Sequence, residues 1–160
     1  MIMISKYYLK KISDNIFRVH SNELSICPVC ASRVVVIGTR KRIFFGNYEE
    51  HQFLIIRRLR CTDCKKIHHE LPDLLIPYKR HCAETFEKVV AGDHDGIPCE
   101  ESTVRRMRSW WESFTKYFVS IMISLREKYG IVFSSNPMPK EIVKITVNTN
   151  FWVHTRSAFL

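Results

Sequence analysis

Four cysteines in two identically spaced pairs constrain this chain more than any other feature. Two residues separate Cys27 from Cys30, and two separate Cys61 from Cys64. A CxxC turn lets two thiolates converge on one ion, and two such turns together complete a tetrahedral shell of four sulfurs. Zinc suits this shell because it has no redox chemistry and binds thiolate well. The spacing predicts a structural zinc site with no open position for a substrate.

Other interpretations of these residues stay open. The four cysteines could be buried without a ligand, or they could hold iron as in rubredoxin. Rubredoxin-like sites usually have glycine after each pair, whereas Ala31 and Lys65 stand there in this chain. His68 or His69 could replace a cysteine ligand, although a phosphate contact or packing against the ribbon is favoured. Cys82 and Cys99 fit no pairing pattern and are predicted to be small core residues.

The residues around the two pairs predict a zinc ribbon. Segments 33–45 and 53–60 are rich in β-branched and aromatic residues, which favour strands, and residues 46–52 predict the turn or loop between them. Residues 4–20 predict an edge strand or a lead-in to the ribbon. Pro72 and Pro77 indicate an extended crossing that leaves the ribbon.

After Pro77 the pattern becomes helical. Residues 78–91 predict a helix that ends at Gly92, with one apolar face made by Tyr78, Cys82, Phe86, Val89 and Val90. Residues 92–98 predict a loop.

The next helix is the strongest helical prediction. Ser102 and Thr103 are predicted to cap its start and Gly130 to end it. Its apolar residues recur every three or four positions, with Trp110 beside them: Val104, Met107, Trp111, Phe114, Phe118, Ile121, Leu125 and Tyr129. Residues 131–139 predict a linker, and residues 140–160 a short helix and an apolar segment, with Phe151 and Trp152 docked on the core.

The sequence thus predicts an α+β protein in which an N-terminal β-rich zinc ribbon precedes an all-helical, helix-turn-helix-like segment with one long helix. Residues 1–76 and 77–160 are the two predicted domains, the second including the C-terminal docking segment.

The charge of the chain favours an anionic partner. The formal net charge is +9, and basic residues are in excess in residues 1–60 and 101–160, which flank an acidic middle. Hydroxyls and arginines at the start of the long helix are suited to phosphates and guanine edges, unless they are only a solvated face. These nucleic-acid candidates are Ser102, Thr103, Arg105, Arg106 and Arg108. A second phosphate-facing surface is predicted on the ribbon at Arg40, Lys41, Arg42, Arg58 and Arg60, and strand alternation turns Arg57 to the other side.

Targeting signals are not recognisable. The first residues lack the pattern of a secretory signal, and the longest apolar run, "YFVSIMISL", is too short to span a bilayer. We expect a cytoplasmic protein, where paired cysteines bind metal more often than they form disulfides.

Four stretches together resemble a family of short, largely uncharacterised bacterial proteins with a zinc ribbon followed by a helix-turn-helix-like segment, often labelled transposase-like. These stretches are "CPVC", "LRCTDCKKIHHELPDLLIPYKRH", "AETFEKVV" and "ESTVRRMRSWW". The resemblance covers about residues 25–157 and implies a zinc site at the four paired cysteines and a DNA-directed role.

The function expected from the sequence is non-catalytic, zinc-dependent binding of nucleic acid, chiefly double-stranded DNA, by an accessory module or small regulator of a mobile element. The alternative is a protein-interaction module, in which the acidic residues Asp93, Asp95, Glu100 and Glu101 meet a basic partner. An enzyme is the weakest hypothesis. The chain is too short for a ribbon plus a DDE-type nuclease domain, and His68 with Glu70 is the only acid–base pair that suggests itself.

Overall fold

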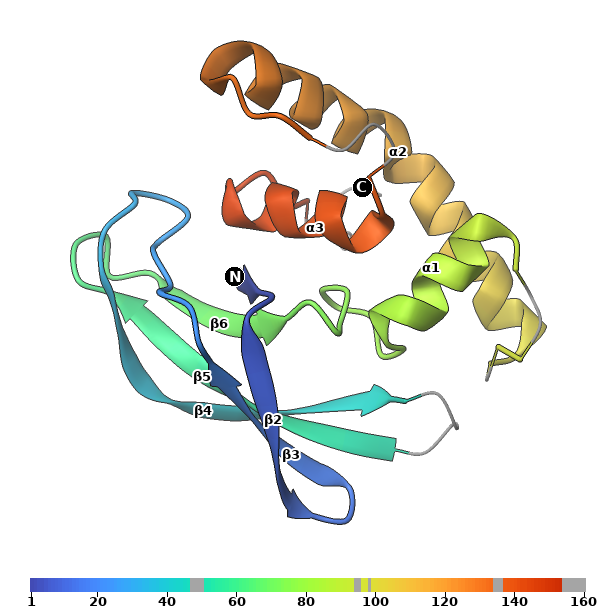
Figure 1. Ribbon diagram of the computed structural model, residues 1–160, viewed down its shortest axis with the longest axis horizontal. Coiled ribbons are helices and arrows are strands. Elements are labelled where there is room, and N and C mark those ends of the chain that lie inside the picture. Colours follow the sequence, from blue (N-terminus) through green and yellow to red (C-terminus); the bar gives the residue numbers. More distant parts are fainter. Residues whose placement is uncertain (47–50, 94–95, 98, 134–136, 154–160) are drawn as a thin grey trace.

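The computed structural model describes residues 1–46, 51–93, 96–97, 99–133 and 137–153. In this part of the chain six strands precede three helices, one of them long, which confirms the mixed α+β prediction. The elements are β1 (Ile2–Ile4), β2 (Tyr7–Ser13), β3 (Ile16–Ser21), β4 (Val34–Phe45), β5 (His51–Cys61), β6 (Ile67–Pro72), α1 (Ala83–Ala91), α2 (Glu101–Tyr129) and α3 (Pro139–Asn148). The helices lie together on one side of the strongly twisted sheet (Figure 1).

Strand β5 organises the sheet. It pairs antiparallel with β4 along its length, antiparallel with β6 near its end, and parallel with β3. Strand β1 adds to β6 in parallel, and β2 forms a hairpin with β3. Leu54, Ile56 and Leu59 are buried on β5, which is what a central strand with both faces covered requires.

The two predicted ribbon strands are confirmed as β4 and β5. The predicted loop at 46–52 falls largely on residues 47–50, which lie outside the described residues, and His51 and Gln52 already belong to β5. The prediction of one edge strand or a lead-in at residues 4–20 gave too few strands. Residues 2–21 form three strands, and one of them, β1, lies between β6 and helix α3.

The helix predicted from residue 78 begins only at Ala83. Residues 78–82 are held outside it by isolated bridges between Phe45 and His81 and between Leu75 and Cys82. Tyr78 has φ +64°, a left-handed conformation that non-glycine residues rarely adopt. The predicted end is confirmed, because Gly92 caps α1 in the left-handed conformation.

Helix α2 starts and packs differently from the prediction in detail. It begins at Glu101 after the N-cap residue Glu100, so the prediction that Ser102 and Thr103 cap it is wrong: both already lie in its first turn. Its buried residues are Met107, Trp110, Phe114, Phe118, Met122 and Leu125, so Trp110 belongs to the core stripe and Tyr129 is exposed. Gly130 ends the helix in the left-handed conformation, as predicted.

The connection from α1 to α2 covers residues 92–100, in which residues 94, 95 and 98 lie outside the described part. A helix-turn-helix usually has a turn of three or four residues. The helix-turn-helix character predicted from the sequence therefore stays a prediction.

One cluster of buried side chains joins the sheet to the helices, running from Ile2 on β1 to Val147 on α3. Trp152 stacks on Phe118 with ring centroids 5.9 Å apart, in accordance with the predicted docking of this residue, whereas Phe151 is exposed. The division into domains at residues 76 and 77 stays a prediction. Of the predicted linker, residues 134–136 lie outside the described part, as do residues 154–160 of the last segment.

The described helices include none that is both long enough and apolar enough to cross a membrane.

Helix α3 is fixed to the sheet by one amide side chain. Asn148 accepts a hydrogen bond from the Met3 backbone N–H (2.8 Å) and donates one to the Met3 carbonyl (2.9 Å), so it satisfies both backbone groups of a buried strand residue. Its amide acts like one further residue of a neighbouring strand.

We predict that Asn148→Ala lowers the free energy of unfolding by about 1–3 kcal/mol, because both backbone groups of Met3 lose their partner in a buried place. Urea denaturation followed by circular dichroism measures the loss. The control is Asn22→Ala, at an exposed position of the chain. Equal stability of the two variants would contradict the prediction.

Candidate metal centre and basic groove

The β4–β5 hairpin brings the two cysteine pairs together. Strand β4 begins just after the first pair, and β5 runs into the second, so that Val34 lies opposite Cys61 in the ladder. The Arg33 carbonyl accepts hydrogen bonds from the Thr62 backbone N–H (3.0 Å) and hydroxyl (3.1 Å). Residues far apart in sequence thus become neighbours through ordinary antiparallel pairing.

The two turns have matching backbone geometry. The Cys27 N–H donates to the Ser32 carbonyl (2.9 Å), and the Cys61 N–H donates in the same way to the Lys66 carbonyl (3.0 Å). Ala31 has φ +59° and Lys65 has φ +62°, so the residue after each pair is left-handed in both turns. Glycine adopts this left-handed conformation without strain, which explains why it is common at this position in related turns. A non-glycine residue stays in it, at a cost in free energy, only where the surrounding structure requires the turn.

The four sulfurs are placed as one ion would hold them. Their Sγ atoms all lie within 4.8 Å of one another. The Cys27–Cys64 distance is 3.6 Å and the Cys30–Cys61 distance is 3.4 Å. A tetrahedral ion with metal–sulfur bonds of about 2.3 Å needs sulfurs about 3.8 Å apart. All six cysteines belong to the described part of the chain, and none forms a disulfide, so the donor set fits a metal ion.

Polar contacts reinforce the two turns. The Ser32 hydroxyl, in the first turn, donates to the Asp63 carboxylate in the second at 2.6 Å. This hydrogen bond, with one from Thr62, lowers the pKa of Asp63. Hydrogen bonds from Ser32 and the neighbouring Cys61 lower the pKa of Cys30, which favours its thiolate. The pKa of Cys64, although a hydrogen bond with the Lys66 backbone lowers it, is raised to about 12 by burial and the neighbouring thiols.

His68 supports the sulfurs and is not one of the four-ligand set. It is buried, with Nε2 3.3 Å from Cys27 Sγ and Nδ1 3.2 Å from the Met1 amino group. Burial, followed by the charges of the amino group and Lys66, lowers the pKa of His68 to about 4. With Nδ1 accepting from the amine, a neutral ring would carry its proton on Nε2, in position to donate it to Cys27 Sγ.

An ion pair between the half-buried Arg57 and the buried Glu70 lies next to the chain that enters the first turn. Arg57 donates from Nε and Nη2 to the two oxygens of Glu70, each at 2.6 Å, and Ser25 donates to the same carboxylate at 2.6 Å. Glu70 is 1% exposed. The Arg57–Glu70 pair, with Ser25, consequently ties β5, β6 and the segment before Cys27 to one another.

The predicted phosphate-facing residues of the ribbon separate into two faces. Arg58 lies opposite His69 in the ladder, and Arg40 and Arg42 lie opposite the buried Ile56 and Leu54 on that same face. Lys41 points to the other face, where its Nζ lies 3.9 Å from the centroid of the Phe53 ring. Arg60 is exposed and follows Arg58 by two residues, in the direction of the metal site.

The predicted nucleic-acid-binding residues on α2 differ in which hydrogen bonds and ion pairs they already make within the protein. Arg105 pairs with Glu101 at 3.2 Å, and both are exposed. Arg106 donates to the Ser102 carbonyl and to the Thr103 hydroxyl, so Thr103 holds an arginine and does not cap the helix. Ser102 donates to Glu100, and Arg108 is exposed.

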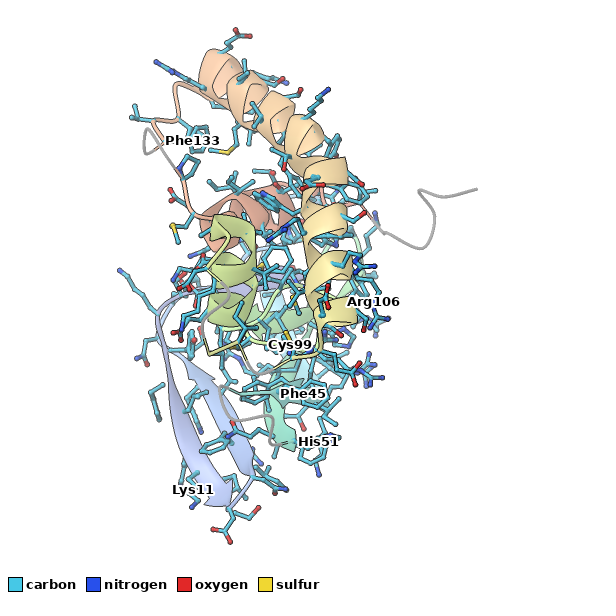
Figure 2. The ribbon with its side chains drawn as sticks, turned by 90° about the vertical axis from the view of Figure 1, so that its right-hand side faces the viewer. Lys11, Phe45, His51, Cys99, Arg106 and Phe133 are labelled. Atoms are coloured by element: carbon cyan, nitrogen blue, oxygen red, sulfur yellow. The ribbon has the colours of Figure 1, made fainter. Side chains whose placement is uncertain are left out.

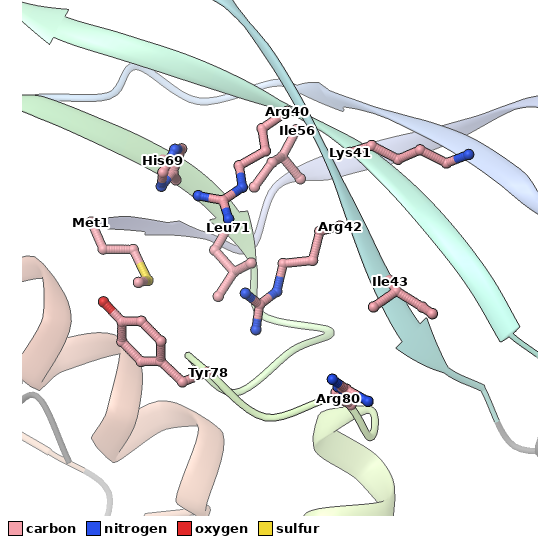
Figure 3. A pocket seen from close by; sticks show the side chains of 10 residues that line it. All are labelled: Met1, Arg40, Lys41, Arg42, Ile43, Ile56, His69, Leu71, Tyr78 and Arg80. Atoms are coloured by element: carbon pink, nitrogen blue, oxygen red, sulfur yellow. The ribbon is translucent and has the colours of Figure 1, made fainter. Parts of the chain in front are cut away.

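Two cavities connect these surfaces. The first, of about 740 Å³, is lined on the sheet by Arg40, Arg42, Ile56, His69 and Leu71, with Met1, Lys41, Ile43, Tyr78 and Arg80 around them (Figure 3). The second, of about 420 Å³, is lined by Phe45, Tyr78, Lys79, Arg80, His81, Thr103, Arg106 and Met107. Because Tyr78 and Arg80 line both, the cavities are adjacent, and we refer to them together as the basic groove.

Tyr78, Lys79 and Arg80 are functional candidates that the sequence did not supply. The signal was present in "PYKRH", a basic cluster after Pro77, but its period suggested the inner face of a helix. In the structure this segment crosses between the sheet and α2. Burial lowers the pKa of Lys79 to about 8, and its Nζ lies 4.2 Å from the centroid of the Trp110 ring.

We predict that Cys30→Ser and Cys64→Ser each reduce bound metal from about one ion per chain to nearly none, because three thiolates do not complete a closed tetrahedral shell. Elemental analysis of the purified protein measures the metal. Cys99→Ser, outside the group of four, should keep the full content. Retention of metal by both ligand variants would exclude this site.

We also predict that His68→Gln weakens Zn²⁺ affinity by about 10–100-fold, the usual cost of losing a hydrogen bond to a metal ligand. Competition with a coloured chelator measures the affinity. His69→Gln is the matched control, because the neighbouring ring lies on the other face of β6. A larger loss in the His69 variant would show that the two roles are reversed.

Comparison with known proteins places these elements in one family. Residues 27–107 match the family described as Domain of unknown function (DUF6431), which covers both cysteine pairs, the β6–α1 connection and the first turns of α2. No curated protein and no solved structure matches the chain. The match extends over half of the chain, and the protein therefore belongs to the DUF6431 family.

Proposed function

We propose that this protein is a non-catalytic, zinc-dependent DNA-binding protein, an accessory module or small regulator of a mobile element. The observation that carries the proposal is the basic groove, which joins the basic residues of β4 to the first turns of α2. The described residues that line it include no aspartate or glutamate. A continuous cationic surface of this kind suits a chain of phosphates.

Zinc has a structural part in this proposal. The metal fixes the open end of the β4–β5 hairpin, and the hairpin carries Arg40, Arg42 and Arg58 on one face. A shell closed by four thiolates leaves no open position for a substrate or a water nucleophile. For this reason we propose a binding protein and not an enzyme, in a reducing cytoplasm where thiolates persist.

Duplex DNA is the proposed partner because of the extent of the groove. Phosphates would lie along Arg40, Arg80 and Arg106, which come from three separate segments. The start of α2, with Arg105 and Arg108, would then face a groove of the duplex in a helix-turn-helix-like manner. The resemblance to transposase-like ribbon proteins supports the same partner.

A protein-interaction module is the second candidate, and edge strand β4 favours it. Val35, Val36 and Ile37 are 41%, 54% and 41% exposed beside the metal site, and a bulge follows between Val36 and Gly38. An exposed apolar edge can accept a strand from a partner. Of the acidic residues in the predicted alternative, Glu101 pairs with Arg105, and Asp95 lies outside the described residues.

We predict that the triple variant Arg40→Gln, Arg80→Gln, Arg106→Gln loses most of its affinity for duplex DNA. Its plot of log affinity against log salt should also become shallower by about one for each phosphate contact removed. Fluorescence anisotropy across a salt series measures both. Binding by the unchanged protein that is insensitive to salt would refute the proposal.

The control triple is Lys10→Gln, Lys11→Gln, Arg18→Gln, which removes equal charge from the β2–β3 hairpin, whose Lys11 lies well apart from Arg106 in Figure 2. Similar losses in both triples would mean that only net charge matters. Full retention by the groove variant, with zinc content and fold intact, would favour the protein-interaction module.

A further inference from the structure

The larger cavity of the basic groove collects positive charge without compensation. Arg40 and Arg42 come from β4 and Arg80 from the segment before α1, and Arg40 and Arg42 reach toward its interior in Figure 3. The His69 ring of β6 lines the same cavity as a polar, uncharged group. The pKa of His69 is lowered first by burial and then by the positive charge of Arg40. Arg58 of β5 and the Met1 amino group lower it further, so both add to the positive potential of the cavity. No carboxylate is found among the described residues lining it.

Arg42 is the most informative of these cations. Burial lowers its pKa, and the nearby Arg40 and Arg80 lower it further. Its Nη2 donates to the Lys79 carbonyl at 3.1 Å, whereas its buried Nε has no hydrogen-bond partner within the described structure. A buried donor on a charged group is costly when it is left without an acceptor.

Arg57, another half-buried arginine of the sheet, shows how this fold compensates such a charge. Arg57 donates hydrogen bonds to both carboxylate oxygens of Glu70, and these hydrogen bonds raise the pKa of Arg57. Arg42, on the next strand and the opposite face, receives no carboxylate in the described structure although Arg40 and Arg80 stand nearby. The acceptor missing at Arg42 is most simply supplied from solution, as an anion.

The shape and lining of the cavity define this anion. Guanidinium groups bind phosphate oxygens through paired hydrogen bonds, and a dianion neutralises several converging cations better than a singly charged diester does. Tyr78, held in a left-handed conformation on the other side of the cavity, adds a hydroxyl and a ring. About 740 Å³ is enough for a phosphate with its attached sugar.

We propose that the cavity formed by Arg40, Arg42, His69, Tyr78 and Arg80 binds a terminal phosphate group, a phosphate monoester carried by the end of a DNA strand or by a free nucleotide. This inference rests on the proposed function in that the cavity is one part of the basic groove. It adds that the protein distinguishes phosphorylated strand ends from internal phosphates.

The test uses the full chain with its metal and two duplexes of one sequence, which carry either 5′-phosphate or 5′-hydroxyl ends. Fluorescence anisotropy should give at least about tenfold tighter binding of the 5′-phosphate duplex. Arg40→Gln, at an exposed arginine, should abolish this preference, and Arg42→Gln should do the same if the variant folds. Lys10→Gln is the matched control, because Lys10 lies on the β2–β3 hairpin, does not line the cavity and should leave the preference intact.

Calorimetry with inorganic phosphate and with adenosine monophosphate distinguishes the two sources of the phosphate. Saturable binding of either one, lost in Arg40→Gln, together with equal affinity for both duplexes, would identify a free nucleotide or phosphate as the occupant. Equal duplex affinities without any binding of phosphate or nucleotide would overturn the inference. Binding of the 5′-hydroxyl duplex tests the proposed function separately, because it depends on the whole groove and not on a terminal phosphate.

Discussion

The convergence of four sulfurs at the end of the β4–β5 hairpin is the constraint on which the rest of the structure depends. Thiolates held within 4.8 Å of one another repel unless a cation lies between them. A bound metal ion would remove this repulsion and hold the two cysteine turns together at this end of the sheet. Once it is closed, the register of β4 against β5 is fixed from Val34 to Phe45. That register determines which arginines share a face, because a shift by one residue would exchange the two faces.

Two further sets of hydrogen bonds link the strands next to the cysteine turns to the helices. The Arg57–Glu70 pair, with Ser25, connects β5 and β6 to the chain entering the first cysteine turn. Asn148 then connects β1, the neighbour of β6, to helix α3. Removing Arg57 would leave the buried carboxylate of Glu70 without its cationic partner, so this chain of contacts has little tolerance for substitution. The basic groove lies between sheet and helices and depends on both.

Much of the fold followed from local pattern, and the errors have a common physical origin. The β-branched runs gave β4 and β5, and the glycines at 92 and 130 gave the ends of two helices. Residues 78–82 also have a helical period, but bridges from His81 to Phe45 and from Cys82 to Leu75 keep them out of the helix, since tertiary contacts outweigh a weak local preference. The start of α2 moved for a related reason: Glu100 occupies the capping position, and Thr103 accepts a hydrogen bond from Arg106 instead.

The sequence by itself determined the four candidate metal ligands, the two ribbon strands and the long helix, because each depends on spacing along the chain. Only the tertiary structure decided which histidine supports the sulfurs, that Lys41 turns away from Arg40 and Arg42, and that Arg80 bridges the sheet and α2. These outcomes depend on strand register and on the path of residues 73–82 across the sheet. No local pattern specifies them, since they come from contacts between segments distant in sequence.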